Sequence, residues 1–265
     1  MPQTGDQFDK PPSWFESSAG KRLQGIEERQ LALMLPRTAA GYLVQYPCPF
    51  GELNLTELPP RLVPLRIGGT SPGEGGTGPG EGGTGAGMRL PADTHALPFG
   101  DNSLGAIIMP HSLEEEAHPD ELLGEAVRAL EPEGALLMSG FNPWSLFGLL
   151  RLGGRFRRER TQVKGPWAAH FRSISRVRRE LRESDLEIEQ ITTVFYRWPS
   201  GADPFGWGGG MMERLGPRLL PQHGGIYFVL ARKRTFCATP IIYRLPARPQ
   251  RRQLLAGSPA REGLW

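Results

Sequence analysis

Polar side chains stand directly after three apolar runs in the middle of this sequence. Asp93 follows the first run, His111 follows the second, and Asn142 and Trp144 follow the third. The runs span residues 88–90, 104–109 and 134–139. Because the carboxyl ends of parallel strands meet in one crevice of an open α/β sheet, these four side chains are predicted to lie near one another.

The residue types indicate what such a crevice could do. A carboxylate such as Asp93 accepts hydrogen bonds, and an imidazole such as His111 can take a proton near neutral pH, as a catalytic base does. Asn142 and Trp144 could shape or hydrogen-bond a substrate. Each residue also has a structural explanation. Asp93 could cap the turn at Thr94, and His111 could pack or begin a helix. Asn142 could open a turn, and Trp144 could belong to the core.

The apolar pattern predicts the elements that position these residues. Strands are predicted at 39–46, 62–67, 88–90, 104–109, 134–139, 185–195 and 225–232, and helices at 14–34, 120–130, 173–183 and 211–220. In the first helix Leu23, Ile26 and Leu33 recur near helical spacing, and Glu27 is expected on another face. Strands that alternate with helices predict a doubly wound α/β sheet.

Composition separates one region that is predicted to fold from three segments that are predicted to be flexible or disordered. Glycine (35 residues) and proline (26 residues) are abundant, and a glycine repeat occupies 73–86 with almost no apolar side chain to offset the entropy of ordering. The prediction is a flexible lead-in at 1–13 and one domain at 14–235. A disordered glycine-rich insertion at 68–87 and a disordered basic tail at 236–265 complete the expected organisation.

Charge and cysteine content narrow the class of protein. The two cysteines have no metal-ligand or redox spacing, so no metal site is predicted and a reduced, cytoplasmic compartment is expected. No apolar stretch approaches the roughly 20 residues of a membrane helix, so no integral membrane contact is expected. The net charge is only +3, but arginines cluster at 155–160, 176–182, 232–234 and 248–252. Such clusters suit either nucleic acid or simple solvation.

The central segment carries a combination of residues that is specific as an ensemble. An acidic residue, Asp93, precedes the turn Leu97-Pro98-Phe99. The residues that continue the pattern are Ser103, Ile107, Met109, His111, Pro119, Glu125, Arg128, Pro132 and Gly134. In this combination residues 88–139 resemble the carboxyl half of a class I S-adenosylmethionine-dependent methyltransferase domain of the type 11 kind. With 140–148 and Trp14-Phe15, the chain looks like a poorly characterised bacterial subgroup of these proteins.

The resemblance implies a fold, a cofactor and a set of roles. It implies a Rossmann-like methyltransferase fold with a mostly parallel seven-stranded sheet and a late antiparallel strand, and it implies S-adenosylmethionine as cofactor. Asp93 would accept a hydrogen bond from the adenine amino group, and His111 would be the catalytic residue. The full set expected to bind the cofactor is Gln45, Tyr46, Gly51, Asp93, Thr94 and His111. Asn142 and Trp144 would contact a small-molecule acceptor.

The chain departs from the family pattern on the ribose and carboxylate side. The Gly-x-Gly loop that follows the family's first strand is replaced by a run with Pro47, Pro49 and the single glycine Gly51. No acid follows the second strand at 68–70, and Gly105 stands where the family usually has Asp. Prolines remove backbone donors, and side chains block close approach to a ligand.

Three hypotheses follow from these observations. The first is a methyltransferase with an altered cofactor loop, acting on a small molecule or a nucleic acid. The second is a catalytically degenerate methyltransferase fold that serves as a binding or regulatory protein through its arginine clusters. The third, a dinucleotide-dependent oxidoreductase, is disfavoured because no Gly-x-Gly-x-x-Gly follows a strand. The sequence indicates neither the acceptor nor the oligomeric state.

Overall fold

The computed structural model describes residues 17–49, 53–55, 57–67, 88–114, 116–146, 148–149, 170–196 and 210–234. All of them belong to one compact unit, Met1–Thr235. The predicted lead-in at 1–13, the glycine-rich insertion at 68–87 and the tail at 236–265 lie outside the described residues. None of the described helices is both long and apolar enough to cross a membrane.

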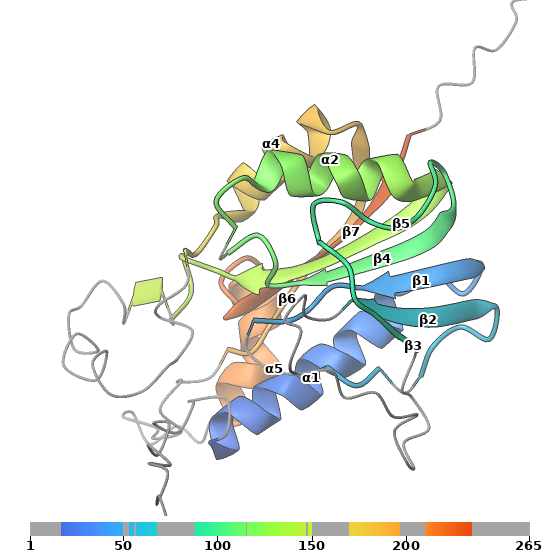
Figure 1. The fold of residues 1–265 in the computed structure, drawn as a ribbon. Helices are drawn as coiled ribbons and strands as arrows, with labels where there is room; N and C mark the ends of the chain where they lie inside the picture. The colour runs from blue at the N-terminus through green and yellow to red at the C-terminus, as the bar shows by residue number, and fades with distance from the viewer. Residues whose placement is uncertain are drawn as a thin grey trace, which may run out of the picture. The chain divides into compact units, whose positions relative to one another are not determined.

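The described strands form a single seven-stranded sheet (Figure 1). Its members are β1 (Gly41–Gln45), β2 (Leu62–Ile67), β3 (Met88–Leu90), β4 (Leu104–Pro110), β5 (Leu130–Phe141), β6 (Leu186–Val194) and β7 (Ile226–Lys233). The spatial order is β3-β2-β1-β4-β5-β7-β6, and β7 runs antiparallel to both of its neighbours while the first five strands pair in parallel. The predicted fold class, including the late antiparallel strand, is confirmed.

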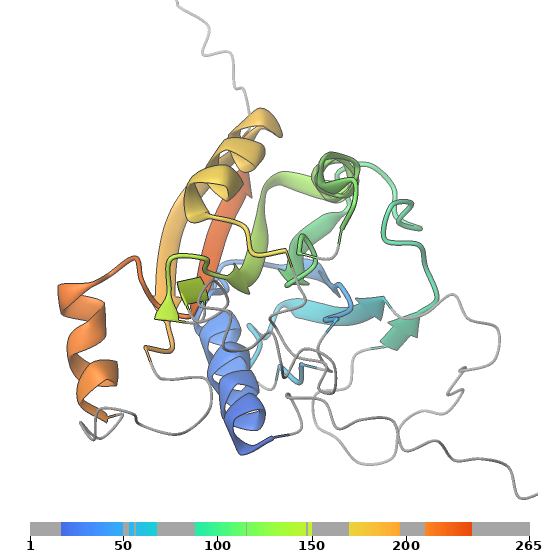
Figure 2. The ribbon, with the colours of Figure 1, turned by 90° about the vertical axis from the view of Figure 1, so that its left-hand side faces the viewer.

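Helices cover both faces of the sheet. They are α1 (Ser18–Met34), α2 (Pro119–Ala129), α4 (Ile174–Glu183) and α5 (Gly210–Leu219). Leucines of α2 and α4 pack into one core cluster with β4 and β5, and leucines of α1 pack into a second cluster on the opposite face. Figures 1 and 2 show α2 and α4 on one side of the sheet and α1 and α5 on the other. Two covered faces explain why β4 is buried along its whole length and has no alternation of polar residues.

Local signals determine where the helices begin. Ser17 caps α1, its hydroxyl oxygen accepting a hydrogen bond from the N–H of Gly20 at 3.2 Å, and Pro36 follows the helix end. Pro119 occupies the first turn of α2, where its missing N–H removes no helical hydrogen bond, and Arg128 lies in the last turn beside the negative end of the helix dipole.

Gly105, a departure from the family pattern, has a structural reason. A Cβ at this position would collide with the backbone carbonyl of Ala40, because β4 and the chain entering β1 approach each other closely there. Only glycine allows this approach. The residue therefore serves the packing of β1 against β4.

Candidate functional site

The parallel strands bring most of the predicted residues to one edge of the sheet. The order β3-β2-β1-β4-β5 places the residues after β3, β1, β4 and β5 along the same carboxyl edge. Asp93, Tyr46, His111 and Asn142 follow these four strands. The residues after β2 lie outside the described part of the chain, and so does Gly51.

Asp93 is an exposed carboxylate held in a defined orientation. Its Oδ1 accepts a hydrogen bond from the N–H of His95 at 2.9 Å and lies 3.5 Å from Nδ1 of the same residue. The hydrogen bond from that N–H holds the pKa of Asp93 below its usual value, so the group is an anionic acceptor at neutral pH. Nε2 of His95 lies 3.3 Å from Glu116 Oε2, which connects the end of β3 to the loop after β4. Asp93 thus caps its own turn and still presents a carboxylate to solvent.

The side chains at the end of β1 mainly make hydrogen bonds to the backbone of neighbouring segments. Tyr46 is fully buried, and its hydroxyl donates to the carbonyl of Thr94 at 3.2 Å. Burial, with the nearby charge of Glu125, raises the pKa of this phenol well above its usual value. Gln45 uses its side-chain amide to donate to the carbonyl of Leu53 at 3.0 Å. The side chains of Gln45 and Tyr46 are therefore occupied within the protein, and Thr94 contributes its carbonyl to this arrangement.

His111 lies in a buried cluster of charged groups. The side chain is 1% exposed, with Nδ1 3.1 Å from Glu114 Oε2 and Nε2 3.2 Å from Glu27 Oε1. Glu27, on α1, also accepts a hydrogen bond from the hydroxyl of Ser139 on β5. Glu114 accepts a further bond from the N–H of Phe141. The cluster connects α1, the turn after β4, and β5 across the middle of the fold.

The two carboxylates decide the charge of His111. Burial by itself lowers the pKa of an imidazole, but the charges of Glu27 and Glu114 and their hydrogen bonds outweigh it and raise the pKa of His111 to about 10. Burial raises the pKa of Glu114. His111 is therefore protonated at neutral pH and acts as the cation between two acids. Both ring nitrogens face these acids, an arrangement that disfavours proton abstraction from a substrate; the catalytic role of His111 stays a prediction.

Sequence patterns missed the partners of His111. Glu27 was expected on a charged face of the first helix, but it is 3% exposed and lies between the buried leucines Leu23 and Leu31. The signal was present, because Glu27 is four residues from each leucine and therefore shares their face. An acid in the middle of an apolar stripe indicates a buried partner, and here that partner is His111.

Asn142 and Trp144 have opposite environments. Asn142 is fully buried, and its side-chain amide donates to the carbonyls of Gln222 at 2.6 Å and Gly224 at 3.1 Å while its oxygen accepts from the N–H of Trp144 at 3.1 Å. It joins the end of β5 to the loop before β7. Trp144 is 68% exposed, so it does not belong to the core. A role for either residue in binding a substrate stays a prediction, and Trp144 is the one with a surface to offer.

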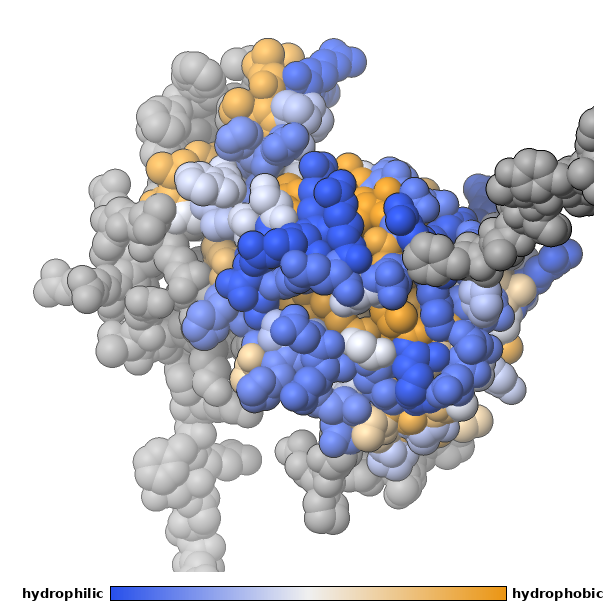
Figure 3. All heavy atoms as spheres, turned by 90° about the horizontal axis from the view of Figure 1, so that it is seen from above, coloured by the Kyte–Doolittle hydropathy of each residue, from blue (hydrophilic) through white to orange (hydrophobic). Residues whose placement is uncertain are grey.

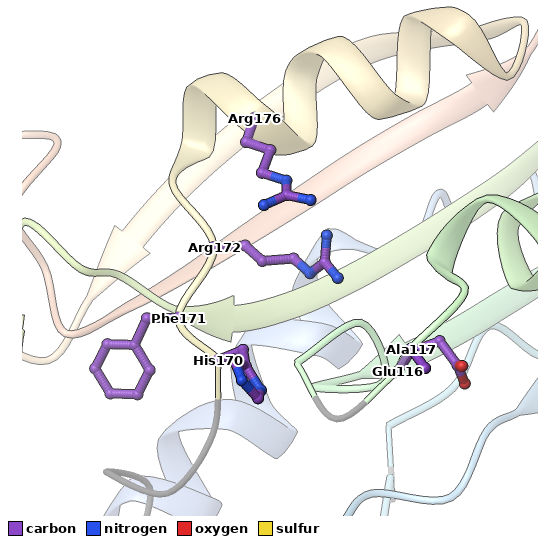
Figure 4. A pocket seen from close by; sticks show the side chains of 6 residues that line it. All are labelled: Glu116, Ala117, His170, Phe171, Arg172 and Arg176. Carbon is purple, nitrogen blue, oxygen red and sulfur yellow. The ribbon is translucent and has the colours of Figure 1, made fainter.

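A pocket of about 430 Å³ opens beside this edge (Figure 4). Glu116 and Ala117 line it from the loop between β4 and α2. On the other side it is lined by His170, Phe171 and Arg172 from the chain that leads into α4, and by Arg176 from the first turn of α4. The volume suits a small organic molecule. Of these residues the sequence patterns singled out only Arg176, as a member of the arginine cluster at 176–182, because the two walls come from segments more than 50 residues apart.

In the basic cluster of α4, Arg176 lines this pocket and the other arginines face the solvent. Arg178, Arg179 and Arg182 are exposed on the outer face of the helix, whereas Val177 and Leu181 are buried beneath it. Figure 3 views the protein from the side of α2 and α4 and shows hydrophilic residues over most of the coloured face. Among the described residues, no group of three or more His, Cys, Asp or Glu side chains is arranged to hold a metal ion.

The segment that contributes Asp93 and His111 to the carboxyl edge of the sheet is similar to known proteins. Residues 83–138, which include β3, β4, α2 and much of β5, match the model of a methyltransferase domain. An uncharacterised protein of Escherichia coli K12, YafS, is 42% identical over 65 residues, which span 24% of this chain and 27% of that protein.

Solved structures with low sequence identity share the fold. A Thermotoga maritima protein described as an S-adenosylmethionine-dependent methyltransferase and possible histamine N-methyltransferase aligns with a TM-score of 0.51 at 15% identity, covering 82% of this chain and 91% of that one. A chain from a Haloferax volcanii complex of the Trm112 methyltransferase activator with a proposed methyltransferase aligns with a TM-score of 0.51 at 15% identity, covering 84% and 99%. At this identity the likeness shows the fold alone.

Proposed function

From the match of residues 83–138 to a methyltransferase domain and from the fold, we propose that this chain is a class I S-adenosylmethionine-dependent methyltransferase that transfers the methyl group of S-adenosylmethionine to a small-molecule acceptor. The observation that carries the proposal is the position of the matched segment. It supplies Asp93 and the loop after β4 to the carboxyl edge of the sheet, where open α/β folds bind ligands.

The adenine end of the cofactor fits the residues present. Asp93 offers an exposed, anionic carboxylate that His95 holds in place, and such a group can accept a hydrogen bond from the exocyclic amino group of adenine. Tyr46 and Thr94 support this end from beneath through their hydrogen bond. The half-buried Ala92 before the turn would supply apolar surface for the ring.

The residues present fit the methionine end of S-adenosylmethionine less well than the adenine end. Pro47 and Pro49 have no N–H to offer a carboxylate, and the N–H of Tyr46 is used by the carbonyl of Ile108 at 2.8 Å. This observation supports a second candidate, in which the chain is a degenerate methyltransferase fold that acts as a binding or regulatory protein. In that case its partner would contact the exposed arginines of α4, and nucleic acid is one such partner.

Methyl transfer makes modest demands on the protein. The bound sulfonium supplies an activated methyl group, so the enzyme's part is to align a nucleophile with it and to exclude water. The pocket between the loop after β4 and the start of α4 would hold the acceptor. The ion cluster around His111 would fix the turn after β4, between the cofactor and the acceptor, in one conformation. We therefore favour a positioning role for His111, and a catalytic role would require its release from Glu27 and Glu114.

Binding of the cofactor is the direct test. Isothermal titration calorimetry of the purified protein with S-adenosylmethionine and S-adenosylhomocysteine should give binding in the micromolar to millimolar range, about −4 to −8 kcal/mol. Asp93→Asn should weaken the affinity roughly tenfold, because a carboxylate accepts more strongly than an amide. Asp101→Asn, which changes a carboxylate at the amino end of β4, is the matched control and should bind as the wild type does.

The same titrations separate the two candidates. No heat at millimolar ligand would overturn the enzyme proposal and leave the binding protein. Equal losses in the Asp93 and Asp101 variants would remove Asp93 from the cofactor site. Binding of RNA or DNA with a steep salt dependence would support the second candidate, since each neutralised phosphate releases counterions.

A further inference from the structure

The pocket beside the carboxyl edge contains more positive than negative charge. Arg172 Nη1 and Arg176 Nε each lie 2.8 Å from the same oxygen, Oε1 of Glu180. One carboxylate therefore neutralises only one of the two guanidinium groups. Figure 4 shows the side chains of Arg172, from the segment before α4, and Arg176, from α4, lining the pocket next to each other.

The other acid in the pocket wall does not remove the excess charge. Glu116 Oε1 accepts a hydrogen bond from the N–H of His118 at 3.0 Å, and Oε2 lies 3.3 Å from His95 Nε2. In Figure 4 its carboxylate points away from the two arginines. Its charge is thus directed toward the Asp93 turn and not toward the pocket.

The arginines keep hydrogen-bond donors available. Arg172 is 8% exposed and is held in place, because its Nε also donates to the carbonyl of Leu113 at 2.7 Å. Within the described part of the chain, Arg172 Nη2 and both Nη atoms of Arg176 donate to no protein acceptor. A guanidinium that is already fixed in position loses little conformational entropy when it binds a ligand.

We propose that this pocket selects a small acceptor that bears an anionic oxygen group, a carboxylate or a phosphate, and that Arg172 and Arg176 bind this group. The proposal deepens the proposed function and rests on it. Guanidinium groups match the geometry of such oxyanions with paired N–H donors. The pocket volume of about 430 Å³ leaves room for the part of the molecule that is methylated, beyond the anionic group.

Calorimetric titrations with matched probes test the charge preference. The probes are benzoate, phenyl phosphate and the neutral isostere benzamide, each with and without millimolar S-adenosylhomocysteine. At least one anion should bind roughly tenfold more tightly than benzamide. The comparison of benzoate with phenyl phosphate identifies which oxyanion the pocket prefers. Equal affinities for the anions and benzamide would overturn the proposal.

Two arginines of the same helix supply the variant and its control. Arg176→Gln should weaken binding of the preferred anion roughly tenfold, whereas Arg179→Gln should leave it unchanged. Arg179 lies on the exposed face of the helix, where its Nε is 3.9 Å from Oε1 of Glu183. Both substitutions are at exposed positions, so both variants should fold. Equal weakening in the two variants would show diffuse attraction to a basic surface and would refute the assignment.

Measurement of cofactor binding distinguishes failure of the anion-binding proposal from failure of the proposed methyl transfer. Arg176→Gln should bind S-adenosylhomocysteine with wild-type affinity. Intact cofactor binding without anion selectivity would overturn this inference alone. Anion selectivity without any cofactor binding would overturn the proposed methyl transfer and, with it, the assignment of the anion as a methyl acceptor.

Discussion

Replacement of Glu27 by Gln tests the buried cluster around His111. The change keeps the size and shape of the side chain and can keep the hydrogen bond from Ser139, but it removes one of the two charges that face the imidazolium. Loss of one partner from a buried ion pair costs about 3–5 kcal/mol. Since domains of this size unfold with about 5–15 kcal/mol, the variant should remain folded but should be clearly less stable.

The pH dependence gives the prediction its specificity. The pKa of His111 is raised to about 10 in the folded protein, from an ordinary value of 6.5. Between these values the folded protein holds a proton that the unfolded chain has released. The stabilisation is therefore complete below pH 6.5 and is lost as the pH rises through 10, at up to about 1.4 kcal/mol for each pH unit. The raised pKa of Glu114 acts in the same direction, starting at lower pH.

Urea unfolding followed by circular dichroism at pH 7 and pH 9 measures this effect. The difference between wild type and Glu27→Gln should be about 3 kcal/mol at pH 7 and should narrow toward about 1 kcal/mol at pH 9, because the remaining carboxylate raises the pKa of His111 less. Groups that titrate alike in both proteins cancel in the difference. The control is Glu28→Gln, which changes the neighbouring acid that accepts bonds from Asn54 and Gln24.

Two results would refute the reasoning. If Glu27→Gln and Glu28→Gln unfolded at the same urea concentration, the buried pair would contribute nothing beyond a surface contact. If the loss in Glu27→Gln were the same at pH 7 and pH 9, His111 would not be the titrating group.

Two further predictions concern the frame around the site. Asn142→Ala should lower the free energy of unfolding by about 2 kcal/mol in urea titrations, because two carbonyls of the loop before β7 lose their donor. The neighbouring Trp144→Ala should change it by about 0.5 kcal/mol or less since that ring is exposed, and equal effects would contradict the role given to Asn142. Gly105→Ala should destabilise by about 3 kcal/mol or prevent folding, as judged by circular dichroism of the purified protein, because the added methyl collides with the backbone at Ala40; a wild-type melting curve would contradict this.

The succession of elements was predictable because its causes are local. The alternation of apolar runs with helical periodicity located all seven strands, and β4 was recognisable as a continuous apolar run. The boundary at β5 was less well predicted. That strand begins at Leu130, because Leu130 already pairs with Leu104 before the register shifts near Glu133, which has a positive φ of 64°. Pairing with a distant strand decided this boundary, and periodicity does not report such pairing.

For the site residues, too, the position in the fold was predictable and the contacts of the side chain were not. Their position at strand ends followed from the order of the elements, so the sequence predicted that Asp93, His111 and Asn142 would share one edge. It did not predict how each side chain is used. Asn142 turns into the protein to bind a loop 80 residues away, and Trp144 beside it faces solvent.

By itself, the sequence determined the fold class, the order of the strands along the chain and the likeness of the central segment to a methyltransferase domain, because propensity, periodicity and strand-end residues act over short distances. Only the tertiary structure decided the partners of His111 and the walls of the pocket. Glu27 and Ser139 meet across 112 residues, and Glu116 lies opposite Arg172 only because α2 and α4 pack on the same face of one sheet. Charge and burial at these positions depend on neighbours that no local pattern specifies. The nearness of two carboxylates made His111 a buried cation, and the sharing of one carboxylate by Arg172 and Arg176 left the pocket with excess positive charge.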